Sequence, residues 1–174
     1  HPVCFKILSE NQDFTNYETL HTKMINAVID YINYLYDFTK PKDIFYISID
    51  GVAPSAKLKQ QRSRRFKSVK EKKLINSIKR KHGKEIKPYW TNSCISPGTK
   101  FMEQLANKIT EYCKELKKNN PNLEIIFSTS NTPAEGEHKI LQHIRKNRPS
   151  KKENTMIYGL DADLIFLALS TSVD

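Results

Sequence analysis

Carboxylate side chains follow three apolar segments of the chain, and this spacing could build a metal site. Asp50 comes directly after the run IFYISI at 44–49. Two glutamates lie a short loop after LEIIF at 123–127 and two aspartates follow TMIYG at 155–159, so that the five acids are Asp50, Glu135, Glu137, Asp161 and Asp163. Crowded carboxylates raise one another's pKa values unless a cation holds them. Such oxygen ligands favour Mg²⁺ or Mn²⁺, and two of these ions can activate water for attack on phosphorus.

Each acid taken alone also has an ordinary structural explanation. Asp50 precedes a glycine and could be a turn residue, whereas Glu135 could complete a capping box with Thr132. Asp161 could cap a helix. Because Glu135 and Glu137 lie about 200° apart on an ideal helix, we expect one to bind metal directly. The other would act through water or from an unwound first turn.

A basic segment begins a few residues after Asp50 and carries most of the positive charge. From Lys57 to Lys87 there are 14 Lys or Arg and 2 acids, a local charge of 14 − 2 = +12, whereas the whole chain carries +10. Such a segment can be a solvated helix, but local excess charge also marks proteins that bind polyanions. Four of its residues share about 100° of one helical face and could hold a terminal phosphate: Lys57, Gln61, Arg64 and Arg65.

The elements that must position these residues alternate between helices and strands. Caps, apolar spacing and helix-breaking residues predict the following elements. Irregular residues 1–14 precede a helix from Thr15 to just before Pro41, a strand at 44–49 and a helix at 55–82. There follow a helix from Pro97 to Asn119, a strand at 123–127, a helix opening at Thr132, a strand at 155–159, and a short buried helix or strand extension at 163–170.

This order predicts an α/β fold in which helices flank a mostly parallel central sheet on both faces. Ligands of such sheets bind outside the carboxyl ends of the strands, which is where the five acids would gather. The length of 174 residues suits one domain. In the basic helix the apolar residues change face near 69–73, which indicates either a bend or a helix that leaves the domain surface.

Composition argues against several other classes of protein. The three cysteines, Cys4, Cys94 and Cys113, are odd in number and form no CxxC, which disfavours a disulfide framework or a zinc cage. No apolar run approaches the roughly 20 residues of a membrane span, and no signal peptide is visible. We therefore expect an intracellular protein with no membrane contact. Tyr89 and Trp90 could stack on bases, although packing is the simpler role.

Four segments in this order resemble the conserved N-terminal nuclease region of the XRN-type 5′→3′ exoribonucleases. They are DGVAPSAKLKQQRSRRF at 50–66, SPGTKFM at 96–102, PAEGEHKI at 133–140 and YGLDADLI at 158–165. The resemblance implies a fold related to PIN and flap nucleases, and hydrolysis of RNA with a 5′-monophosphate to mononucleotides using divalent metals. It departs from the family at Ser55, where arginine is frequent, and at Ala134, where glycine is frequent.

The resemblance also implies a role for each site residue. The catalytic metal ligands would be Asp50, Glu135, Glu137, Asp161 and Asp163, the 5′-phosphate pocket would be Lys57, Gln61, Arg64 and Arg65, and His1 would stack on the first base. It further implies that residues 1–174 form one incomplete nuclease domain, which lacks an upstream aspartate-bearing strand and downstream acids. Such a fragment would be weakly active or inactive alone. For the parent protein we expect a cytoplasmic location, with a nuclear location as the alternative.

Two other functions fit the same residues. A flap or structure-specific endonuclease would share the acids but would need no 5′-phosphate pocket. A non-catalytic nucleic-acid-binding module would use the acids as caps and turns, and its binding would be indifferent to Mg²⁺ but sensitive to salt.

Overall fold

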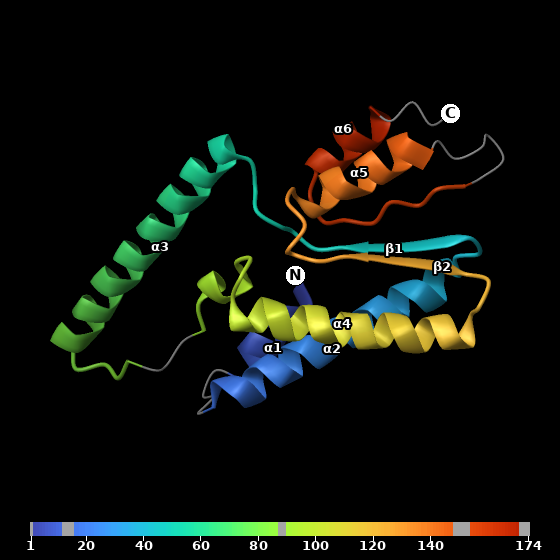
Figure 1. Ribbon diagram of the computed structural model, residues 1–174. Coiled ribbons are helices and arrows are strands. Elements are labelled where there is room, and N and C mark those ends of the chain that lie inside the picture. Colours follow the sequence, from blue (N-terminus) through green and yellow to red (C-terminus); the bar gives the residue numbers. More distant parts are fainter. Residues whose placement is uncertain (1, 12–15, 87–89, 148–153, 171–174) are drawn as a thin grey trace.

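The chain is an α/β structure in which helices surround a short parallel sheet (Figure 1). The computed structural model describes residues 2–11, 16–86, 90–147 and 154–170. Its elements are α1 (Pro2–Glu10), α2 (Tyr17–Thr39), β1 (Ile44–Ser48), α3 (Ser55–Lys81), the 3₁₀ turn η1 (Asn92–Ile95), α4 (Lys100–Asn119), β2 (Glu124–Ser128), α5 (Gly136–Asn147) and α6 (Asp163–Leu169). The sheet has α5 and α6 on one side and α1, α2 and α4 on the other (Figure 1).

The sheet consists of β1 and β2, which pair in parallel from Ile44 opposite Glu124 to Ser48 opposite Ser128. Both strands lie within one residue of the predicted runs, so this pair confirms the parallel arrangement. The third predicted strand is wrong for the described residues, because 154–159 form no ladder with β1 or β2. A β-prone run becomes a strand only where a neighbouring backbone supplies its hydrogen bonds.

Residues 2–10 are helical, which corrects the irregular structure expected for this part of the N-terminal segment 1–14. In α1, Cys4, Ile7 and Leu8 recur at helical spacing and pack against the core. The next helix, α2, begins at Tyr17, where the Asn16 side chain accepts a hydrogen bond from the Glu18 N–H at 2.8 Å. Thr15, the cap expected from the sequence, lies outside the described residues.

Two further predictions of helix position are corrected. The helix expected from Pro97 begins instead at Lys100, and its N-cap is Thr99, whose hydroxyl accepts from the Met102 N–H at 3.4 Å. Gly98 has φ 83°, outside the helical region, and so prevents an earlier start. Residues 163–169 do form a helix, α6, but most of it is not buried: Leu164 is buried, whereas Phe166 is 73% exposed.

The main core lies between α2 and α4 beneath the sheet. Its fully buried side chains are those of Leu20, Met24 and Ile109. Trp90 belongs to the same cluster, and its indole N–H donates to His21 Nε2 at 3.2 Å. Trp90 is therefore a packing residue, as the simpler interpretation held, while Tyr89 lies outside the described residues.

The basic segment forms a single uninterrupted helix, α3, that leaves the domain surface. It has 27 residues and none of them is buried. Figure 1 shows α3 extending away from the layered body, to which the loop after β1 connects it. This outcome explains why its apolar residues share no face, since no neighbouring element imposes one. Among the described residues, no helix is long and apolar enough to cross a membrane.

Candidate metal centre and phosphate-binding helix

The segments that follow β1 and β2 are joined by two backbone hydrogen bonds. The Gly51 N–H donates to Ala134 O at 2.9 Å, and the Ala134 N–H donates to Val52 O at 3.0 Å. A Cβ at Gly51 would lie 1.9 Å from Thr132 O, so only glycine permits this approach. Ala134 has φ 96°, a conformation that glycine adopts more readily than alanine. The two segments thus bring Asp50 beside the start of α5.

The Asp50 carboxylate is fixed by the first turn of α5. Its Oδ1 accepts from the Gly136 N–H at 2.7 Å. An anion at a helix N-terminus is stabilised by the unpaired amides there and by the helix dipole. Asp50 is therefore more than a turn residue, because it ties the end of β1 to the helix that carries Glu137.

Glu135 and Glu137 face the same point, together with His138. One ligand atom from each of these three residues lies within 4.8 Å of the other two. His138 Nδ1 is 3.7 Å from Glu135 Oε2 and 3.8 Å from Glu137 Oε1. The separation of about 200° expected for two glutamates on an ideal helix does not apply, because α5 begins at Gly136 and Glu135 precedes it. The capping-box explanation for Glu135 is also wrong. It requires Thr132 to be the N-cap of α5 and Glu135 to lie in its first turn, whereas Glu135 precedes the helix.

Asp161 lies near Glu137, because both residues line an open cavity of about 170 Å³. Its lining includes Asp50, Glu137 and Asp161, with the remainder supplied by Ser48, Gly136, Ile140, Leu164 and residues 158–160. Burial raises the pKa of Glu137, and the nearby charges of Glu135 and Asp161 add to this effect, while His138 and Lys57 oppose it. Carboxylates from three parts of the chain therefore meet here. The N-cap position of α6 is Ala162, which makes no side-chain capping hydrogen bond, and capping by Asp161 stays a prediction.

Two predicted site residues cannot be placed at the cavity. The structure describes Asp163 as the first residue of α6, but its side chain lies outside the described part. His1 lies outside the described residues altogether. Conversely, sequence reasoning missed His138, although its position directly after two clustered glutamates was a usable signal.

Lys57, predicted to bind phosphate, lies in the acidic cluster itself. Its Nζ is 2.6 Å from Glu135 Oε1, and the Lys57 and Glu135 side chains are 43% and 13% exposed. The hydrogen bond to Glu135 raises the pKa of the Lys57 ammonium. Gln61 is half-buried on the same helix, and Arg64 and Arg65 are exposed. The predicted phosphate-binding face therefore starts at the acids and runs outward along α3.

The donor set fits a divalent cation. Carboxylate oxygens of Glu135 and Glu137 converge with a ring nitrogen, and the Asp50 and Asp161 carboxylates line the adjoining cavity. Hard cations such as Mg²⁺ and Mn²⁺ take carboxylate oxygens and keep some of their water, for which an open cavity leaves room. The ion pair with Lys57 neutralises part of the negative charge of Glu135.

The basic helix α3 thus contacts the acidic cluster through Lys57 and Glu135. The family described as the XRN 5′-3′ exonuclease N-terminus matches residues 1–174. The chain is 38% identical over 168 residues to 5′-3′ exoribonuclease 1 of Schizosaccharomyces pombe, covering 92% of this chain and 13% of that protein. It is 39% identical over 168 residues to 5′-3′ exoribonuclease 2 of Gallus gallus, covering 86% of this chain and 18% of that protein.

The chain therefore belongs to the XRN 5′-3′ exonuclease N-terminal family. A further relative, 5′-3′ exoribonuclease 2 of Arabidopsis thaliana, is 37% identical over 172 residues, which cover 88% of this chain and 17% of that protein. The chain thus spans less than a fifth of the length of these relatives.

Proposed function

We propose that the protein containing this chain is a divalent-metal-dependent 5′→3′ exoribonuclease that degrades RNA bearing a 5′-monophosphate to mononucleotides. The observation that supports it most is the 2.6 Å contact between Lys57 Nζ and Glu135 Oε1. This contact joins the first turn of the basic helix to the acidic site. A 5′-phosphate held by α3 would leave the first phosphodiester bond within reach of the carboxylates.

In this proposal the acids hold two Mg²⁺ or Mn²⁺ ions through Asp50, Glu135, Glu137, Asp161 and Asp163. The ions would supply an activated water and charge stabilisation for the leaving oxygen. The Gly136 amide keeps the Asp50 carboxylate oriented, and burial of Glu137 strengthens its electrostatic interactions by limiting screening.

The 5′-phosphate would be held by Lys57, Gln61, Arg64 and Arg65. Arginine presents planar donors that match phosphate oxygens, while Lys57 is a compact charge that can serve either Glu135 or a phosphate. His1 would stack on the first base, a role that rests on the resemblance alone. The other basic residues of α3 would contact the RNA backbone without reading its sequence.

We further propose that the two strands belong to a larger, mostly parallel sheet of the PIN and flap-nuclease type. Among the described residues β1 pairs only with β2, on one of its edges. Residues 154–159 lie outside that ladder, and Tyr158 reaches the Tyr31 hydroxyl on α2 through a hydrogen bond. An additional strand along the open edge of β1 would complete the sheet. The activity is therefore assigned to the whole protein, and its cytoplasmic residence stays a prediction.

The proposal is tested by incubating the full-length protein and Mg²⁺ with RNAs that differ only in a 5′-monophosphate, 5′-triphosphate or 5′-hydroxyl end. Mononucleotides are expected from the monophosphate RNA and from neither other RNA, and chelation of the metal should stop their release. Internal cuts would favour a structure-specific endonuclease. Salt-sensitive binding without cleavage would favour a binding module, and equal rates on the three ends would contradict the phosphate pocket.

A further inference from the structure

A buried lysine joins the carboxyl ends of the two strands. Lys139 lies on α5 and is only 5% exposed. Its Nζ donates to Ile49 O at 2.9 Å and to Thr129 O at 2.8 Å. Ile49 directly precedes Asp50, and Thr129 begins the loop that leads to Glu135. One ammonium group is thus hydrogen-bonded to the backbone at the start of both acid-bearing segments, the one that carries Asp50 and the one that leads to Glu135.

The location of Lys139 is unusual for a charged side chain. Buried lysines are rare unless they are paired, and here the hydrogen-bond partners are two carbonyl oxygens. Burial lowers the pKa of the Lys139 ammonium, and the Asp50 charge acts in the opposite direction. The hydrogen bonds of Gly51, Ala134 and Gly136 join the same two segments close to the acids. Lys139 joins these segments at their other end, where they leave the strands.

We propose that Lys139 is a positioning residue for the metal centre: its ammonium group fixes the spacing between Asp50 and the Glu135–Glu137 segment. The inference rests on the proposed function insofar as those acids bind metal. It assigns Lys139 no contact with RNA or with the reacting atoms.

The charge and the hydrogen bonds of Lys139 predict opposite effects on metal binding. A positive charge beside the site repels a cation, so removing the charge alone would tighten metal binding. Removing the donors leaves the Ile49 and Thr129 carbonyls without this partner and frees the two segments, which would weaken metal binding. Residues that orient metal ligands typically contribute about 10- to 100-fold to metal affinity. We therefore expect the positional effect to dominate.

The test compares two neutral replacements of similar length, Lys139→Met and Lys139→Gln, in the full-length protein. Methionine offers no donor, whereas the glutamine amide can still donate to a carbonyl. Mn²⁺ binding is measured directly by electron paramagnetic resonance, without RNA. We expect Lys139→Met to bind Mn²⁺ about ten-fold more weakly and Lys139→Gln to lose clearly less. Amide exchange should also speed up around residues 49–52 and 129–136 in the methionine variant.

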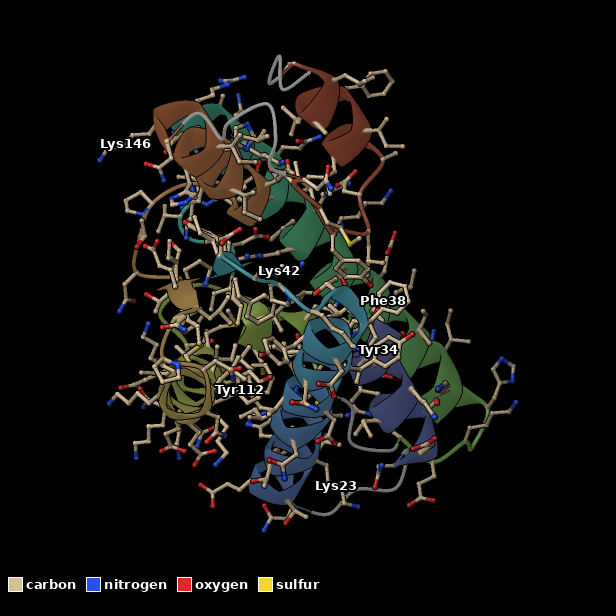
Figure 2. All side chains as sticks on the ribbon, turned by 90° about the vertical axis from the view of Figure 1, so that its right-hand side faces the viewer. Lys23, Tyr34, Phe38, Lys42, Tyr112 and Lys146 are labelled. Carbon is tan, nitrogen blue, oxygen red and sulfur yellow. The ribbon has the colours of Figure 1, made fainter. Side chains whose placement is uncertain are left out.

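Lys146→Met is the matched control, since it removes the same charge from the same helix. Lys146 is exposed near the end of α5, where Figure 2 shows its side chain pointing outward. The Lys146→Met variant should bind Mn²⁺ as tightly as the unmodified protein does. Equal or tighter Mn²⁺ binding by both Lys139 variants would overturn the positioning role, as would equal weakening by methionine and glutamine. Absence of any Mn²⁺ binding in the unmodified protein would instead contradict the proposed metal centre.

Discussion

Replacing Glu137 with glutamine is expected to reduce RNA hydrolysis by the full-length protein about a thousand-fold, the equivalent of about 4 kcal/mol of transition-state stabilisation. Glutamine keeps the size of the side chain but removes the negative charge that faces Glu135 and the cavity shared with Asp161. RNA binding should change little, because α3 supplies the proposed phosphate contacts. Single-turnover hydrolysis and equilibrium binding of the same monophosphorylated RNA measure the two effects.

The same substitution is expected to stabilise the metal-free protein at neutral pH. The pKa of Glu137 is raised above its ordinary value of 4.5 in the folded chain, so its ionisation disfavours folding. By linkage this unfavourable contribution is absent below the ordinary pKa, grows as the pH rises, and is complete above the raised pKa. With a chelator present, Glu137→Gln should therefore raise the unfolding temperature at pH 7.5, and the gain should vanish towards pH 4.

The matched control is Glu115→Gln, which removes an exposed glutamate from α4. It should alter neither hydrolysis nor the pH dependence of unfolding. Full activity of Glu137→Gln would remove Glu137 from the metal centre. A lower unfolding temperature at pH 7.5 would show that favourable contacts with His138 and Lys57 outweigh burial and carboxylate repulsion.

The second large effect is expected at Gly51, where alanine should separate the two acid-bearing segments. The new Cβ would lie 1.9 Å from Thr132 O and 3.1 Å from Ser130 O, both of them backbone atoms. Backbone cannot yield as a side chain does, so the Gly51–Ala134 hydrogen bond should break. We expect a local loss of about 3 kcal/mol, the upper end for overpacking. Amide exchange around 44–52 and 124–136 should then be about a hundred-fold faster.

Gly159→Ala is the control for Gly51→Ala, because it also adds a methyl group near the cavity but not against backbone atoms. Its new Cβ would lie 2.5 Å from Leu164 Cδ2, the end of a flexible side chain that can move aside. Exchange in the same peptides should change less than ten-fold, a local effect of under about 1.4 kcal/mol. Equal acceleration by the two variants would indicate that the close approach of Gly51 to Thr132 has no special importance.

The sequence predicted those elements whose signals are local. The apolar runs at 44–49 and 123–127 lie within a residue of β1 and β2, and the caps and periodicity of α2 and α4 located both helices to within a few residues. The acids that follow β1 and β2 were singled out because parallel strands place their carboxyl ends at one edge, and their role as metal ligands stays a prediction. The resemblance of four sequence segments then indicated one family, and the chain is a member of it.

The errors concern features that depend on partners distant in the sequence. Residues 155–159 have the composition of a strand, but pairing is decided by a neighbour that composition does not reveal. The apolar residues of α6 suggested burial, yet Phe166 is exposed where no described element covers it. The approach of Gly51 to Thr132 and the two carbonyl partners of Lys139 are tertiary contacts, and neither residue carried a distinguishing pattern.

The central claim is that the cationic face of α3 and the acids form one site, joined at Lys57. It is tested most directly by the ratio of kcat/KM for 5′-monophosphate RNA to that for 5′-hydroxyl RNA, measured for Lys57→Met in the full-length protein. General effects on the metal centre cancel in this ratio. Lys59→Met is the control, because Lys59 lies about 160° away around the helix.

We predict that Lys57→Met lowers this ratio at least about ten-fold, the contribution of one charge-assisted hydrogen bond. Lys59→Met should leave it unchanged. An unaltered ratio in Lys57→Met, or an equal fall in the two variants, would contradict the claim that Lys57 links the phosphate-binding face to the acids.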